Sequence, residues 1–113
     1  AERTKRVESG GGSGFRFRVS DAYRIPLRGY LLRLRLLEGE PRLSELGTGS
    51  RLRLRSPDGV EREVRVRGLS ATFGRPSEAS LKRKREIDVV ISESDALAEG
   101  RAVEIGWEAM GPA

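Results

Sequence analysis

The chain of 113 residues contains no cysteine and no histidine. Their absence excludes disulfide frameworks, zinc sites built from Cys or His, thiol chemistry and every catalytic triad that uses histidine. It is compatible with a reducing cytoplasm, where we expect the protein. No run approaches the roughly 20 apolar residues of a membrane span, and no apolar signal-peptide core lies near the start. We therefore expect no membrane partner.

Carboxylates are numerous, but none forms a recognisable catalytic pattern. Pairs such as Glu61/Glu63 and Glu93/Asp95 have strand or loop spacings on faces that should be solvated, which favours plain surface charge over acid–base catalysis. No loop containing Asp58 or these acids has the ligand spacing of a calcium motif. We expect no enzymatic activity, no metal, no cofactor and no small-molecule substrate.

Aromatic residues make up only 5% of the chain. Binders of single-stranded nucleic acid usually present aromatic platforms between basic groups. Phe15 and Phe17 share an apolar face and are expected in the core, which leaves Tyr23, Tyr30 and Phe73 as candidates for exposure. The sequence therefore gives little support to binding by base stacking on aromatic rings.

What the chain does contain is alternation of apolar and polar residues with a period of two, which is typical of half-buried strands. Turn signals rich in Gly and Pro separate these segments, and no long helical period appears. The predicted strands are Phe15–Ser20, Tyr30–Leu37, Arg51–Arg55, Val60–Arg67, Ile87–Ile91 and Ala102–Trp107. The pattern predicts an all-β fold, a small antiparallel closed β-barrel of six to seven strands.

Residues 1–14 have a different composition, because they contain one sizeable apolar residue, Val7, and end in a Gly/Ser run. Such a segment buries too little surface to offset its ordering entropy. We predict a flexible N-terminal tail or linker over 1–14 and a single barrel domain over 15–113.

Several short-range signals refine this prediction. Pro26 cannot donate to a ladder, so strand pairing should lapse there, and Gly29 permits a positive φ or a close backbone approach. Ser56-Pro57-Asp58-Gly59 predicts a hairpin with Gly59 in the left-handed region. Ser77 is a candidate cap for a short helical turn, and residues 94–100 predict another that Gly100 ends. Val60, Val64 and Val66 are the candidates for the inner face of their strand.

The stretch from Asp21 to Gly39 resembles domain II of the translational GTPases, the β-barrel that follows the nucleotide-binding domain in elongation factor Tu. The matching residues are Asp21, Tyr23, Ile25, Arg28, Gly29, Arg35 and Gly39. The likeness extends weakly through Gly47/Gly49 to Leu52 and Leu54, and residues 97–103 are similar to the closing turn and strand of that family. Leu27 and Leu34 stand where the family usually has glycines.

This resemblance implies a barrel fold and the binding of RNA, ribosomes or partner domains. It implies no GTP hydrolysis, because no GTP-binding motif occurs anywhere in the chain. A likeness of fold does not by itself confer a function.

Positive charge is unevenly distributed along the chain. The net charge is +5, with 21 of the 22 Lys+Arg but only 10 of the 17 Asp+Glu before residue 86. Strand alternation turns rows of arginines outward, and a basic run, Lys82–Arg85, precedes a predicted strand. The candidate nucleic-acid-binding residues are Arg28, Arg33, Arg35, Arg51, Arg53, Arg55, Arg65, Arg67, Lys82, Arg83, Lys84 and Arg85. If neighbouring rows align, they form a patch suited to phosphate contacts.

Two other interpretations remain open at this point. The excess of arginine over lysine fits the codon bias of a GC-rich genome, and Glu61 and Glu63 are placed to pair with Arg51–Arg55 across the hairpin. We expect a non-catalytic β-barrel binding module whose partner is RNA or a ribonucleoprotein. The alternative is a protein–protein interaction or regulatory adaptor domain with a protein partner.

Overall fold

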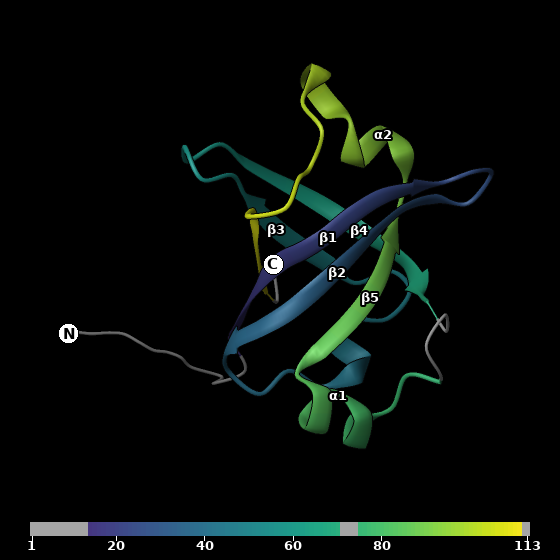
Figure 1. The fold of residues 1–113 in the computed structure, drawn as a ribbon, viewed down its shortest axis with the longest axis vertical. Coiled ribbons are helices and arrows are strands. Elements are labelled where there is room, and N and C mark those ends of the chain that lie inside the picture. Colours follow the sequence, from purple (N-terminus) through teal and green to yellow (C-terminus); the bar gives the residue numbers. More distant parts are fainter. Residues whose placement is uncertain (1–13, 71–74, 112–113) are drawn as a thin grey trace.

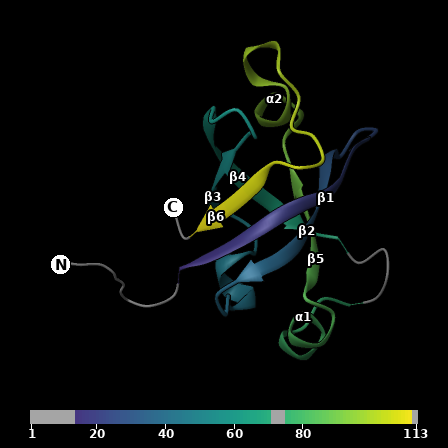
Figure 2. The same ribbon diagram turned by 60° about the vertical axis from the view of Figure 1, so that its left-hand side comes forward.

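The protein is a closed antiparallel β-barrel in its computed structural model, which describes residues 14–70 and 75–111. Six strands close in the order β1-β2-β5-β4-β3-β6 (Figures 1 and 2). The predicted all-β barrel is confirmed. The predicted tail over 1–14 lies outside the described residues, except for Gly14. No helix of the described part is long and apolar enough to cross a bilayer.

Short helical turns connect β2 to β3, β4 to β5 and β5 to β6, and η2 and η3 among them are 3-10 helices. In chain order the elements are β1 (Phe15–Ile25), β2 (Gly29–Glu38), η2 (Leu43–Glu45), β3 (Arg51–Arg55), β4 (Glu61–Leu69), α1 (Glu78–Lys84), β5 (Glu86–Ile91), α2 (Glu93–Ala96), η3 (Ala98–Gly100) and β6 (Glu108–Gly111). The tip of the β1–β2 hairpin and α1 lie toward opposite ends of the barrel (Figure 1).

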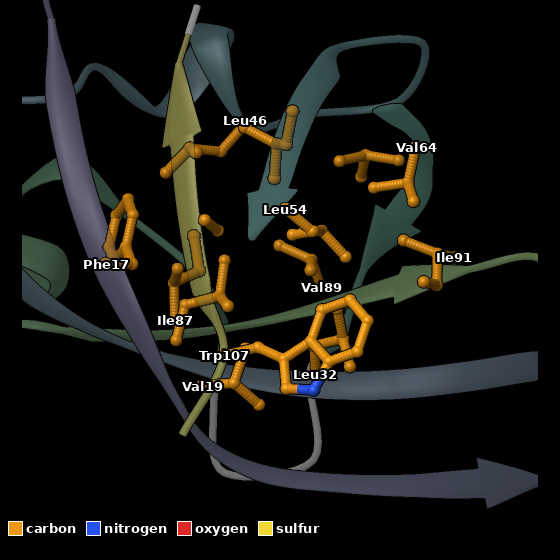
Figure 3. Close-up of a cluster of buried hydrophobic side chains, with 14 of the residues drawn as sticks. Phe17, Val19, Leu32, Leu46, Leu54, Val64, Ile87, Val89, Ile91 and Trp107 are labelled. Atoms are coloured by element: carbon orange, nitrogen blue, oxygen red, sulfur yellow. The ribbon is translucent and has the colours of Figure 1, made fainter. Parts of the chain in front are cut away.

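The inward face of each strand supplies the core, as the alternation predicted. Figure 3 shows side chains from β1, β2, β3, β4 and β5 meeting inside the barrel, with Leu46 from the segment after η2 and with Trp107 beside Leu32. Ala109 of β6 belongs to the same buried cluster. Fully burying a valine or leucine contributes roughly 1.5–3 kcal/mol, so this interior is the main source of stability.

The β1–β2 hairpin is longer than expected, because β1 runs past Ser20 to Ile25 with a register shift between Val19 and Asp21. Pairing does lapse at Pro26. The Arg28 amide donates to the Ile25 carbonyl at 3.0 Å, and Leu27, the third residue of this turn, has a φ of 67°. Type II turns usually place glycine at that position.

Gly29 combines both properties that the sequence indicated. Its φ is 127°, and a Cβ there would collide with the Ile91 carbonyl oxygen on β5. Gly39 is equally constrained at the other end of β2, with a φ of 93° and backbone contact with Gly14 and Phe15. The two glycines therefore allow β2 to lie close against its neighbours at both ends.

The last predicted strand, Ala102–Trp107, is wrong. These residues form a loop, and the closing strand β6 begins at Glu108. Gly106 has a φ of 100° that interrupts any strand, although its amide donates to the Val19 carbonyl at 2.9 Å. Trp107 is buried as expected, whereas Ile105 is 62% exposed.

On β4 the predicted inner residues Val64 and Val66 are buried, but Val60 lies in the turn and is exposed. Arg62 occupies the inward position next to Val64. Its guanidinium lies over Trp107, with the guanidinium carbon 5.1 Å from the ring centroid. The alternation of apolar residues did not reveal this inward arginine.

Candidate nucleic-acid interface

The outward arginines of β2 lie beside acids that β5 supplies. Arg33 Nε and Nη2 donate to the two carboxylate oxygens of Asp88 at 3.0 and 3.1 Å, and both side chains are partly buried. The hydrogen bonds from Arg33 to Asp88 raise the pKa of the arginine. Arg35 pairs with Glu86 at 3.3 Å. These two ion pairs offset the positive charge of the outward arginines on β2.

On the β3–β4 hairpin the pairing across strands that the sequence left open is present, but it is diagonal. Arg51 lies 3.9 Å from Glu63, and Arg53 lies 4.0 Å from Glu61. All four side chains are about half exposed. Such exposed pairs contribute between zero and about 1 kcal/mol each. Arg55 makes no such pair and instead contacts the Met110 sulfur at 3.4 Å.

The strand order determines whether the rows of outward arginines form one continuous basic patch. β5 carries Glu86 and Asp88 on its outer face and lies between β2 and β4, while β6 carries Glu108 and lies between β1 and β3. Two acid-bearing strands thus separate the β1–β2 arginines from the β3–β4 arginines. The structure does not bring all the predicted arginines into one patch.

Within each half, however, arginines lie directly opposite one another. Arg18 on β1 is the cross-strand partner of Arg35, and Arg51 on β3 is that of Arg65 on β4. Like charges in opposite positions destabilise a sheet unless an anion compensates them. Arg18 and Arg65 are exposed or partly exposed, and neither side chain pairs with a carboxylate of residues 14–70 or 75–111.

Lys82, Arg83 and Lys84 of the basic run lie on α1 rather than in a loop, and Arg85 follows as the residue that ends the helix. The Ser77 hydroxyl caps the helix by accepting from the Ser80 amide at 3.0 Å, as predicted, and the helix continues to Lys84. Only Leu81 of this helix is buried. The cations therefore occupy the last turn, where the helix dipole favours positive charge.

The four basic side chains of this run are exposed, and none pairs with a carboxylate in the described part of the chain. Arg85 ends the helix with a φ of 57°, and its carbonyl accepts from the Leu36 amide at 2.8 Å. This bond fixes the basic end of α1 beside β2. The next residue, Glu86, forms an ion pair with Arg35 on β2. Arg35 in turn lies opposite Arg18 on β1.

A cleft of about 300 Å³ opens where α1 meets the outer face of β5. It is lined by Arg33, Ser70, Arg75, Pro76, Ser80, Lys84, Glu86, Ile87 and Asp88. Its two carboxylates are already engaged by Arg33 and Arg35, whereas Arg75 and Lys84 have no acidic partner among the described residues. The cleft is therefore suited to an anionic group, and Arg75 is a candidate that reasoning on strand alternation missed.

The remaining predicted arginines lie apart from this region. Arg28 is exposed at the β1–β2 tip, and Arg65 and Arg67 point outward from β4 without an acidic partner in the described residues. Among those residues, no three acidic side chains gather closely enough to hold a metal ion.

Compared with known proteins, the chain matches no family model and has no significant match among curated sequences.

Proposed function

We propose that this barrel is a non-catalytic RNA-binding module, related in architecture to domain II of the translational GTPases. Its interface is the basic face formed by Lys82–Arg85, Arg75, Arg35 and Arg18. One observation carries the proposal: the four cations of the run Lys82–Arg85 are consecutive, exposed and without a carboxylate partner in the described chain, whereas six strand arginines have one, namely Arg16, Arg24, Arg33, Arg35, Arg51 and Arg53.

Phosphate backbones are the partners that such a surface fits best. Lysine and arginine bind phosphate oxygens through charge-assisted hydrogen bonds, and each contact releases condensed counterions. The facing arginines Arg18 and Arg35 would lose mutual repulsion when an anion lies between them. Because the face offers few aromatic groups, affinity comes mainly from charge and has little dependence on sequence.

The test is a pair of matched double variants. Lys82→Gln/Arg83→Gln removes two unpaired cations, and Arg51→Gln/Arg53→Gln removes two exposed cations that already have acidic neighbours. Both change the net charge equally. Affinity for a fluorescently labelled 20-nucleotide RNA is measured by anisotropy between about 50 and 200 mM salt, a range over which phosphate contacts weaken steeply.

We expect the variant on α1 to bind several-fold more weakly and the magnitude of its salt slope to fall by roughly 1 to 2, because two phosphate contacts are lost. The control should bind nearly as wild type. Equal losses in both variants would show that only net charge matters, and no binding by wild type at about 50 mM salt would refute the proposal.

A further inference from the structure

The tip of the β1–β2 hairpin presents a leucine that stabilises nothing within the described fold. Leu27 is fully exposed, with a relative accessibility of 106%, and its φ of 67° lies in the left-handed region. A bulky L-residue is strained there, whereas glycine is not. Leu27 thus combines exposed apolar surface with an unfavourable backbone conformation. Strain of this kind is typical of residues kept for contact with a partner.

The groups around Leu27 indicate the chemistry of that partner. Arg24 and Arg28 flank it, and residues 24–30 include no carboxylate. Arg24 pairs with Glu93 of α2 at 2.6 Å, while Arg28 makes no ion pair within the described residues. Pro26 restricts the backbone on the other side of Leu27. An exposed apolar group next to Arg28, which has no ion pair within the described residues, matches the wedges that proteins insert between stacked bases while cations hold the phosphates.

We propose that Leu27 is such a wedge, which enters the shallow minor groove of duplex RNA and unstacks a base step. This inference rests on the proposed function, because the same RNA would lie along the β1–β2 ribbon toward Arg35. Arg35 follows Leu27 by eight positions, a span of roughly 26 Å along an extended chain.

The experiment uses Leu27→Gly and Leu27→Asn, both of which tolerate a positive φ and remove the apolar group. Leu37→Asn is the matched control, since Leu37 is also an exposed leucine, at 39%, near the other end of β2. Each protein is titrated into a 20-base-pair RNA duplex that carries 2-aminopurine, whose fluorescence rises when its stacking is lost. Thermal melting of each protein is recorded in parallel.

We expect the Leu27 variants to bind roughly tenfold more weakly, which corresponds to burial of about half a leucine side chain. They should also abolish the fluorescence rise, and the Tm of Leu27→Gly should equal or exceed that of wild type. Leu37→Asn should retain both affinity and fluorescence. A gain in Tm together with a loss of binding cannot come from damage to the fold.

Unchanged affinity and fluorescence in the Leu27 variants would overturn the wedge, while the weakened binding of Lys82→Gln/Arg83→Gln would still uphold the proposed function. Weak binding by the Leu27 variants with normal binding by Lys82→Gln/Arg83→Gln would uphold the wedge and refute the interface on α1. If wild type binds neither the duplex nor single-stranded RNA, both proposals fail.

Discussion

Arg62 holds the segment that covers one end of the barrel. Its Nη1 donates to the carbonyls of Asp95 and Ala96, and its Nη2 donates to those of Ala98 and Arg101, at 2.8–3.2 Å. These carbonyls belong to the region of α2 and η3, where helix ends leave acceptors without partners. The inward Arg62 side chain thus supplies hydrogen-bond donors to four carbonyls of this segment and covers Trp107.

Replacing Arg62 with methionine should therefore destabilise the protein by about 2–4 kcal/mol, because partly buried carbonyls lose their donors. Urea denaturation measures the change in the free energy of unfolding. Arg67→Met is the control, since Arg67 is exposed, and we expect it to change that free energy by at most about 0.5 kcal/mol. A loss below about 1 kcal/mol for Arg62→Met would mean that water replaces the guanidinium at no real cost.

A second contact near this end of the barrel responds to pH. Arg101 donates to both carboxylate oxygens of Asp58, at 2.6 and 3.1 Å, and Ser56 donates to one of them. The hydrogen bonds from Arg101 and then Ser56 lower the pKa of Asp58 from 3.8 to about 2. Since the folded pKa is the lower one, the stabilisation is complete above the unfolded value and is lost as pH falls through the folded value.

The difference in Tm between wild type and Asp58→Asn should accordingly stay constant from pH 7 to about 5 and then shrink progressively until it disappears near pH 1. The variant keeps the side-chain size, removes the charge and replaces one of the two acceptor oxygens with an NH2 donor. Thermal melts monitored by circular dichroism across this range give the comparison. A difference that persists below about pH 1 would assign the effect to packing or altered hydrogen bonding rather than to ionisation.

At the scale of elements, the ends of the strands depend on glycines with two distinct roles. Gly39 and Gly59 share a φ of 93°. A Cβ on Gly59 would meet nothing within 4 Å, but one on Gly39 would press on the backbone of Gly14 and Phe15. Conformation is thus the same at both sites, and only the available space differs.

Substitution by alanine separates these roles. Gly59→Ala should cost about 1–2 kcal/mol from backbone strain alone, and Gly39→Ala should cost roughly 2–5 kcal/mol, because the added methyl also forces β1 and β2 apart. The two free energies of unfolding, measured by denaturant titration, give the steric contribution as their difference. Equal losses in the free energy of unfolding would show that the start of β1 shifts to accommodate the added methyl group at little cost.

The elements that the sequence predicted well are those whose signal is local. Alternation marked the inner residues of β2, β3 and β5, and Ser77 and Gly59 marked a cap and a turn through their own backbone preferences. Alternation failed over residues 102–107, because Gly106 breaks the strand while Val103 and Trp107 still point inward. It could not reveal Arg62 either, since its partners lie more than 30 residues away.

The candidate site, too, could be predicted from the sequence only in part. That the arginines point outward follows from the period of two, but their pairing depends on strand order, which alternation does not encode. Only the position of β5 beside β2 places Asp88 against Arg33. The basic run was visible as sequence, yet its place on a helix depends on Leu81 docking against the core.

For the molecule as a whole, closure depends on the shortest strand. β6 has four residues and joins β1 to β3, so it supplies both of the last two interfaces of the barrel. Without it, β1 and β3 would each present an unpaired edge, which promotes association between chains.

A chain that ends at Trp107 should therefore lose its single cooperative unfolding transition and form concentration-dependent oligomers. Denaturant titration and light scattering together test this expectation, with a chain that ends at Gly111 as the control. A truncated monomer that still unfolds cooperatively would show that the five other strands suffice.

The pairing of β1 with β6 has a topological consequence. Phe15 lies opposite Gly111, so the polypeptide enters and leaves the barrel at neighbouring positions, about 5 Å apart. A unit with that geometry can be spliced into a surface loop of a host protein without spreading the flanking chain. The same adjacency allows the two ends to be joined by a short linker and new ends to be opened at the turn around Gly59, which makes the barrel a natural subject for circular permutation.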